Sequence, residues 1–132
     1  ETRELAFDTV ELNRGIQSDT MSCSIFVPFH GTRLRDLCVQ RGYIRPDVIC
    51  PTNSDDTVLT MPPPFMSRED MKALRRVFTM YVKFPKNRWP EIKRAEELTP
   101  EGDAFWEKLR DEYVDTFLKD PEGDIEKVNA TA

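Results

Sequence analysis

The sequence predicts an α/β fold that is mainly helical and contains few short strands. Five segments carry the apolar spacing of a helix, whereas only two have the composition of extended chain. One of these two, residues 21–27, carries no charge and leads through a turn with Pro28 and Gly31 into a helical pattern that begins near Leu34. A strand, a turn and a helix are half of a βαβ unit. We therefore expect part of a (β/α) barrel, followed by a helical C-terminal extension.

A first helix is expected from Arg3 to about Gln17. Thr2 is a suitable N-cap, because its hydroxyl can accept a hydrogen bond from an N–H group of the first turn. The buried side of this helix is predicted to consist of its apolar residues, Leu5, Ala6, Val10, Leu12 and Ile16.

The segment from Met21 to Val27 is expected to be a buried strand. Apolar residues alternate along it, and the absence of charge is typical of a strand that is covered on one or both faces. Pro28 ends the strand, because proline has no backbone N–H to donate. Thr32 can then cap the next helix, and Gly42 offers a place for that helix to stop.

The expected elements divide the chain into four parts. Residues 1–45 would supply the barrel elements, and residues 46–66 a proline-rich loop with a short extended segment at 57–61. Residues 67–120 would form the helical extension, and residues 121–132 have little to bury and are expected to be disordered.

The extension is predicted to contain three helices. The first begins with a capping box at Ser67 and ends before Pro85, and a short helix follows from about Glu91 to Leu98. The last helix begins at Thr99, which is followed by a proline suited to the first helical turn. Apolar stripes on the first and last of these helices predict core packing.

Composition excludes several classes of protein. The chain has 132 residues, of which 33% are charged, and a net charge of −5, which argues against nucleic acid or an anionic membrane as a partner. No apolar run approaches the roughly 20 residues of a membrane span, and no signal peptide is recognisable. We therefore expect a cytoplasmic protein whose three cysteines are reduced thiols.

A self-contained catalytic or metal site is not expected. His30 is the only histidine, and no cysteine or serine motif accompanies it in the way a nucleophilic dyad requires. The carboxylates form no recognisable pair, and the glycines form no phosphate-binding loop. His30 nevertheless lies near the carboxyl end of the expected strand, which is where parallel barrels place their ligands.

Two short motifs resemble a known family, the radical S-adenosylmethionine (radical SAM) enzymes, and most closely the branch that often carries a cobalamin-binding domain. In that family a Gly-x-Pro-Gly-Glu-Thr turn follows the fifth barrel strand, and a helix, a sixth strand and Pro-x-x-Gly-Thr-x-Leu come next. Glu1 and Thr2 match the end of the turn, and Pro28 to Leu34 match the second motif. The match covers roughly the first third of the chain.

The resemblance implies that the chain begins inside a barrel, in agreement with a first residue that is Glu rather than Met. The parent enzyme would bind a [4Fe-4S] cluster, S-adenosylmethionine and, in some members, cobalamin, and would act by radical chemistry on a small-molecule substrate. The sixth strand lines the adenosine pocket in this family, so Ile25, Phe26, Val27 and Pro28 would contact the adenine and Glu1 would lie beneath the nucleoside. The cysteine triplet that binds the cluster is not in this sequence. The chain itself would hold no cofactor and would be inactive without the rest of its polypeptide.

Other interpretations stay open. Ile25 and Val27 would be ordinary barrel core if Gly31 and Thr32 serve only as a turn and a cap. The chain could equally be an accessory or interaction module, or part of another (β/α) barrel enzyme. In the isolated chain the predicted strand at 21–27 needs a substitute partner, which is either the extended segment at 58–61 or, through self-association, a second chain.

Overall fold

The computed structural model describes residues 1–52 and 56–118, and this part of the chain is mainly helical, as predicted. Its elements are α1 (Arg3–Arg14), α2 (Arg33–Gln40), α3 (Arg68–Lys83), the 3₁₀ turn η1 (Lys86–Arg88), α4 (Trp89–Glu96), α5 (Pro100–Tyr113) and the π-helical turn η2 (Val114–Leu118). The disordered tail predicted at 121–132 lies outside the described residues.

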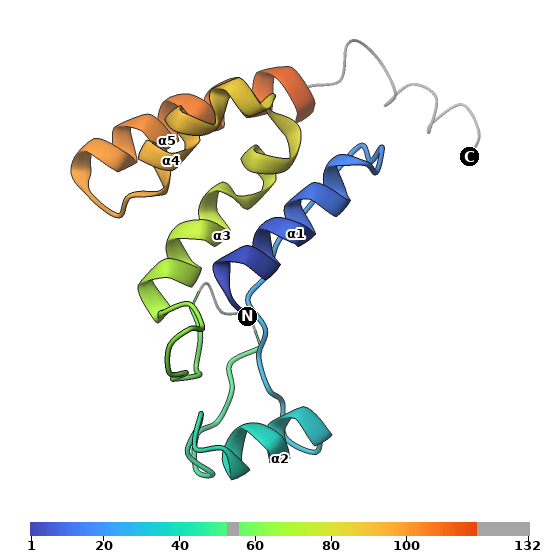
Figure 1. Ribbon diagram of the computed structural model, residues 1–132, viewed down its shortest axis with the longest axis vertical. Coiled ribbons are helices and arrows are strands. Elements are labelled where there is room, and N and C mark those ends of the chain that lie inside the picture. The colour runs from blue at the N-terminus through green and yellow to red at the C-terminus, as the bar shows by residue number, and fades with distance from the viewer. Residues whose placement is uncertain (53–55, 119–132) are drawn as a thin grey trace, which may run out of the picture.

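The helices form two groups. Helices α1, α3, α4 and α5 pack into a bundle, while α2 lies apart and is joined to the bundle by two extended segments that run alongside each other (Figure 1). The core belongs to the bundle, where Phe7, Tyr81 and Trp89 meet edge to face with ring centroids 5.0–5.6 Å apart. The extended segments and α2 are therefore the parts least covered by the core.

The predicted helix starts are confirmed by their hydrogen bonds. Thr2 Oγ1 accepts from the Leu5 N–H at 3.3 Å, and Thr32 Oγ1 accepts from the Arg35 N–H at 3.2 Å. Ser67 forms a reciprocal capping box with Asp70 at the start of α3. Thr99 Oγ1 accepts from the Gly102 N–H at 3.1 Å, with Pro100 as the first residue of α5. Short polar caps are local signals, which is why they could be predicted.

Gly42 ends α2, also as predicted. Its φ is +72°, a left-handed conformation that glycine adopts without a Cβ clash. The Gly42 N–H donates to the Val39 carbonyl at 3.0 Å, and the Tyr43 N–H donates to the Cys38 carbonyl at 2.8 Å. This pair of bonds is the Schellman motif, which turns the chain back over the helix end.

The structure corrects the prediction of two strands. Residues 21–27 and 57–61 are extended, but no strand and no sheet form in the described residues, so a partial barrel is not seen. Exposure still alternates along the first segment: Met21, Cys23, Ile25 and Val27 are half-buried, whereas the residues between them are exposed. The alternation is that of a strand, but a ladder also needs a neighbour at hydrogen-bonding distance and in register, and the extended segments of the described residues do not form one.

The structure also corrects the predicted buried side of α1. Ala6 and Val10 are buried against the core, but Leu5, Leu12 and Ile16 are exposed at 54%, 69% and 53%. The helix ends at Arg14 and not at about Gln17, so Ile16 lies beyond it. Leu5 and Leu12 lie on a different face of the helix from Ala6 and Val10, and α3 covers only the face of Ala6 and Val10. We call the uncovered set, Leu5, Leu12 and Ile16, the α1 stripe.

Arginine side chains fix the helices to one another. Arg14, at the end of α1, donates to the carbonyls of Tyr81, Val82 and Phe84 at 2.7–2.9 Å, where α3 ends and its carbonyls have no helical partner. Arg76 of α3 donates to the Ala95 and Glu97 carbonyls at the junction of α4 and α5.

Candidate functional site

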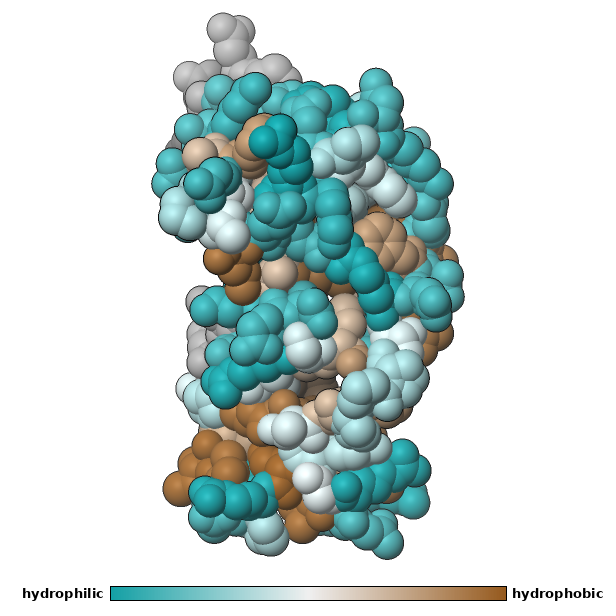
Figure 2. Space-filling model, turned by 60° about the vertical axis from the view of Figure 1, so that its left-hand side comes forward, coloured by the Kyte–Doolittle hydropathy of each residue, from teal (hydrophilic) through white to brown (hydrophobic). Residues whose placement is uncertain are grey.

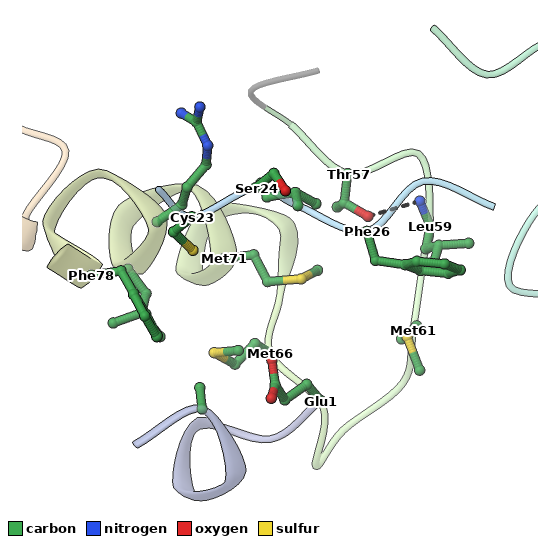
Figure 3. A pocket seen from close by; sticks show the side chains of 14 residues that line it. Glu1, Cys23, Ser24, Phe26, Thr57, Leu59, Met61, Met66, Met71 and Phe78 are labelled. Atoms are coloured by element: carbon green, nitrogen blue, oxygen red, sulfur yellow. Dashed lines mark hydrogen bonds between the residues drawn. The ribbon is translucent and has the colours of Figure 1, made fainter. Parts of the chain in front are cut away.

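A cavity of about 320 Å³ lies between the bundle and the two extended segments (Figure 3). Helices α1 and α3 and the chain that precedes α3 form one wall, and residues 23–26 and 57–61 form the other. Most of its lining side chains are apolar, and three are methionines. The lining residues are Glu1, Ala6, Met66, Met71, Leu74, Arg75 and Phe78 on the first wall and Cys23, Ser24, Ile25, Phe26, Thr57, Leu59 and Met61 on the second.

The spacing of apolar residues along α3 explains how this helix forms its side of the first wall. Met71, Leu74 and Phe78 are three and four residues apart, so their side chains share one face of α3. The Met66 N–H donates to the Glu1 carbonyl at 3.1 Å, which holds the start of α1 beside the start of α3. The wall is therefore built from residues that the capped helices position.

Polar contacts hold the 57–61 part of the second wall in place. The Leu59 N–H donates to Thr57 Oγ1 at 3.0 Å, as the dashed line in Figure 3 shows, and the Thr57 N–H donates to Asp56 Oδ1 at 2.8 Å. Asp56 is also paired with Arg68 of α3 at 2.8 Å. These bonds anchor the 57–61 segment to the first turn of α3 although it has no strand partner.

The surroundings of Cys23 do not activate its thiol as a nucleophile. Burial is the main cause that raises the pKa of the Cys23 thiol, and Glu1 adds to this effect while Arg75 opposes it. A thiol with a raised pKa stays protonated near neutral pH and is a poor nucleophile. The surroundings of Cys23 therefore disfavour its thiolate.

The structure brings three of the five predicted site residues together. Glu1, Ile25 and Phe26 line the cavity, whereas Val27 and Pro28 do not. The Pro28 carbonyl instead accepts hydrogen bonds from Arg35 Nη1 at 3.3 Å and from Cys50 Sγ at 3.2 Å. Pro28 therefore belongs to the region around α2, and His30 is exposed in the turn that follows it.

Arg35 is the centre of that region. Its side chain is buried, and it donates to the carbonyls of Pro28, Pro46 and Val48 and to Cys50 Sγ at 2.7–3.3 Å. A guanidinium carries five N–H donors, so one arginine can bind several chain segments at once. Arg35 thus holds the turn before α2 to the loop after it.

Sequence reasoning missed the larger part of the cavity. Met71 and Phe78 belong to the apolar stripe of the helix predicted after Ser67, and such a stripe has the same appearance whether it faces a core or a cavity. Met66 lies in the predicted proline-rich loop and Cys23 in the predicted strand, and neither was named as a site residue. No signal in the sequence distinguishes these alternatives.

The donor set of the described residues does not suit a metal cluster. No group of three or more His, Cys, Asp or Glu side chains comes together there, and Cys23, Cys38 and Cys50 are separate free thiols. An adenine base, in contrast, suits the end of the cavity at Ile25 and Phe26, because a flat aromatic ring packs well on apolar and aromatic side chains. None of the helices in the described ranges is long and apolar enough to cross a membrane.

Comparison of the chain with protein-family models, with curated proteins and with solved structures gives no match. The resemblance to radical SAM enzymes therefore stays a prediction.

Proposed function

We propose that this chain is the C-terminal part of a radical SAM enzyme, in which it helps to line the pocket for the adenosine moiety and the substrate without being catalytic alone. One observation carries the proposal. An apolar cavity is lined by Glu1, Ile25 and Phe26, which are three of the residues that the resemblance assigns to the nucleoside.

The extended segment at 21–27 supports the same proposal. It carries no charge, it keeps the alternating exposure of a strand, and it has no strand partner in residues 1–52 and 56–118. Such a segment suits the sixth strand of a parallel barrel, whose neighbours would come from preceding chain. The exposed α1 stripe would likewise be covered by that chain.

The cofactors would be held elsewhere in the parent enzyme. S-adenosylmethionine, when bound to a reduced [4Fe-4S] cluster, supplies the radical chemistry of this family. The residues of this chain would bind and orient: Ile25 and Phe26 would contact the adenine, and the apolar walls would exclude water from the substrate. Whether the parent also uses cobalamin depends on a domain outside this chain.

Sequencing the parent gene is the first test. Gly-x-Pro-Gly should stand directly before Glu1, and Cys-x-x-x-Cys-x-x-Cys should lie on the order of 150 residues earlier, a spacing set by a barrel of about 250 residues. Three cysteines so closely spaced can bind one cluster from a single loop and leave one iron open for S-adenosylmethionine. If no such triplet is found, the radical SAM proposal fails and another (β/α) barrel enzyme takes its place.

The second test uses the full-length protein. It should contain about four irons and four sulfides per chain, as one [4Fe-4S] cluster requires, and should release 5′-deoxyadenosine from S-adenosylmethionine after reduction. Phe26→Ala should raise the KM for S-adenosylmethionine. The control is Phe29→Ala, which changes the same residue type outside the cavity and should leave that KM unchanged.

An interaction module is the second candidate, because apolar side chains are exposed around α2. Phe29, Leu34, Leu37 and Ile49 are all exposed, and Figure 2 shows hydrophobic side chains gathered over the end of the molecule that carries α2. A pull-down with the chain alone addresses this candidate. Specific capture of a partner that Leu34→Lys abolishes, together with a full-length protein that contains no iron, would favour it over the enzyme.

A further inference from the structure

We propose that the cavity beside α3 binds an unbranched hydrocarbon chain, the alkyl or acyl part of the substrate. This inference rests on the proposed function only in treating the cavity as part of a substrate pocket. Binding of a hydrocarbon chain can be measured directly, without a cluster and without turnover.

The lining of the cavity determines the chemistry of this ligand. Nine of the fourteen lining side chains are apolar. Glu1, Ser24 and Arg75 supply polar groups, whereas the hydroxyl of Thr57 is already engaged with the Leu59 N–H. A sugar or a second nucleotide would lose hydrogen bonds to water there and would find few replacements, which makes its binding unfavourable. Removing a hydrocarbon chain from water carries no such cost, and its burial is favourable in proportion to its area.

The shape of the cavity favours a narrow ligand. Figure 3 places Phe78 and Cys23 at one end of the lining and Leu59 and Met61 at the other, with Met66 and Met71 between them. A volume of about 320 Å³ that extends in this way suits a single chain better than a fused ring system. Phe26 lies at the end with Leu59 and Met61, so the adenine and the hydrocarbon chain would occupy different parts of the cavity.

The methionines supply the adaptable part of the wall. Met61, Met66 and Met71 have unbranched side chains that can change rotamer to follow a flexible chain. Rigid β-branched residues would impose one ligand shape, and Ile25 is the only isoleucine or valine in the lining of the described structure. The wall therefore suits a series of chain lengths with an upper limit set by the cavity.

Calorimetric titration of the protein with neutral linear 1-alcohols, from pentanol to undecanol, tests this inference. The association constant should rise about fourfold for each added methylene, which corresponds to about 0.8 kcal/mol, until the cavity is filled and the constant levels off. A constant that rises without limit would indicate unspecific partitioning and would overturn the inference. Stronger binding of glucose than of nonanol would also overturn it.

A cavity-filling variant links the binding to this site. Met71→Phe places a larger ring in the lining and should weaken nonanol binding at least tenfold. Met21→Phe is the matched control, because Met21 packs against the core but does not line the cavity, and binding should be unchanged. Equal binding by both variants, with helical content retained, would place the ligand elsewhere and overturn the inference.

A measurement on the unaltered protein covers the case in which a variant fails to fold. Cys23 lines the cavity, whereas Cys50 lies beside Arg35 and is similarly half-buried. Nonanol should slow alkylation of Cys23 by iodoacetamide at least threefold and leave the rate at Cys50 unchanged. No protection of Cys23 would overturn the inference.

The two proposals fail in distinguishable ways. In one outcome the full-length protein contains iron and releases 5′-deoxyadenosine, but its association constants for the alcohols do not rise and level off. That result would support the radical SAM proposal and reject the hydrocarbon substrate. If the constants rise and level off in a protein without iron, the hydrocarbon site is supported and the radical SAM proposal is rejected.

Discussion

Glu96, the last residue of α4, is a carboxylate that is only 4% exposed. Arg3 donates to both of its oxygens at 2.5 and 2.8 Å, and the Tyr81 hydroxyl donates to Oε2 at 2.9 Å. Burial alone would raise the pKa of the carboxyl, but the hydrogen bonds from Arg3 and Tyr81 outweigh burial and lower it. Burial, with the nearby Glu96 charge, raises the pKa of the Tyr81 phenol. One carboxylate thus joins α1, α3 and α4.

Replacing Glu96 with glutamine tests the value of this contact. Glu96→Gln keeps the shape but removes the charge that Arg3 faces, and we expect a loss of about 2 kcal/mol in the free energy of unfolding. Urea denaturation followed by circular dichroism measures it. Glu107→Gln makes the same change at an exposed site on α5 and should have an effect below about 0.5 kcal/mol. Equal effects of the two variants would show that the buried pair contributes nothing.

The same pair predicts how stability depends on pH. The pKa of Glu96 is lower in the folded protein than its ordinary value of 4.5, so its contribution is present above that value and is lost as the pH falls through the folded pKa. The difference in unfolding free energy between the unaltered protein and Glu96→Gln should therefore be constant near neutral pH and shrink below 4.5. Denaturation midpoints at a series of pH values measure this, and a difference that persists undiminished at pH 2 would contradict it.

At the scale of elements, the first turn of α5 lies very close to the end of α4 at Gly102. A Cβ built on Gly102 would lie 1.9 Å from the Glu97 carbonyl oxygen and 2.8 Å from its carbon. That carbonyl also accepts from Arg76 Nη2 at 2.7 Å, so it cannot move away without losing this bond. Gly102 is needed here for space, not for an unusual backbone conformation.

Gly102→Ala should therefore destabilise the protein by about 3 kcal/mol, at the upper end of the usual cost of overpacking. Gly15→Ala is the matched control. Its Cβ would meet only the Leu12 carbonyl at 3.4 Å and its φ of −78° is ordinary, so the change should be neutral or slightly stabilising. Thermal denaturation of both variants measures the difference. Similar melting temperatures would show that the junction can relax.

Arg35 holds the region around α2 together. A variant at this residue should lower the stability of that region without lowering the stability of the bundle. Arg35→Met removes the donors to the carbonyls of Pro28, Pro46 and Val48 and so breaks the contacts that hold the turn before α2 to the loop after it. Amide exchange in residues 28–50 should become about tenfold faster or more, while α3 and α5 keep their protection. Arg33→Met, a change at an exposed position of the same helix, is the control and should leave these rates unchanged. Uniformly faster exchange would mean that α2 and the bundle unfold together.

At the scale of the whole molecule, apolar surface is left uncovered on both groups of helices. The α1 stripe runs along one side of the bundle, and a second exposed set surrounds α2. Acidic residues flank the stripe on α1, including Glu4 and Asp8, which lie on neighbouring turns. Uncovered apolar area of this kind favours association with another surface.

We therefore expect the chain by itself to self-associate in a concentration-dependent way. Leu12→Lys places a charge in the middle of the α1 stripe, where the native side chain is 69% exposed, and should shift the chain toward monomer without loss of helix. Sedimentation equilibrium measures the association. Glu107→Lys, a charge change on α5, should leave the association unaltered. A chain that is monomeric at high concentration would contradict this expectation.

Much of the helical fold could be predicted because its signals are local. The caps at Thr2, Ser67 and Thr99 and the stop at Gly42 each depend on a few neighbouring residues, and their hydrogen bonds form as expected. The candidate site could be predicted only in part. Glu1, Ile25 and Phe26 were named through a resemblance, whereas Met71 and Phe78 were indistinguishable from core residues.

The sequence by itself determined where α1, α2, α3 and α5 begin, that α2 stops at Gly42 and that residues 21–27 are extended, because backbone conformation responds to nearby side chains. The end of α1, predicted at about Gln17, comes earlier, at Arg14. Only the tertiary structure decided which apolar face of α1 is buried, that Glu96 is enclosed by Arg3 and Tyr81, and that the walls of the cavity face each other. These outcomes depend on contacts between residues far apart in the chain, and a periodic pattern shows that a face is apolar without showing what covers it. Residues 21–27 form no ladder for the same reason, since a strand requires backbone hydrogen bonds to a neighbour, and the extended segment beside it forms no ladder with it in the described chain.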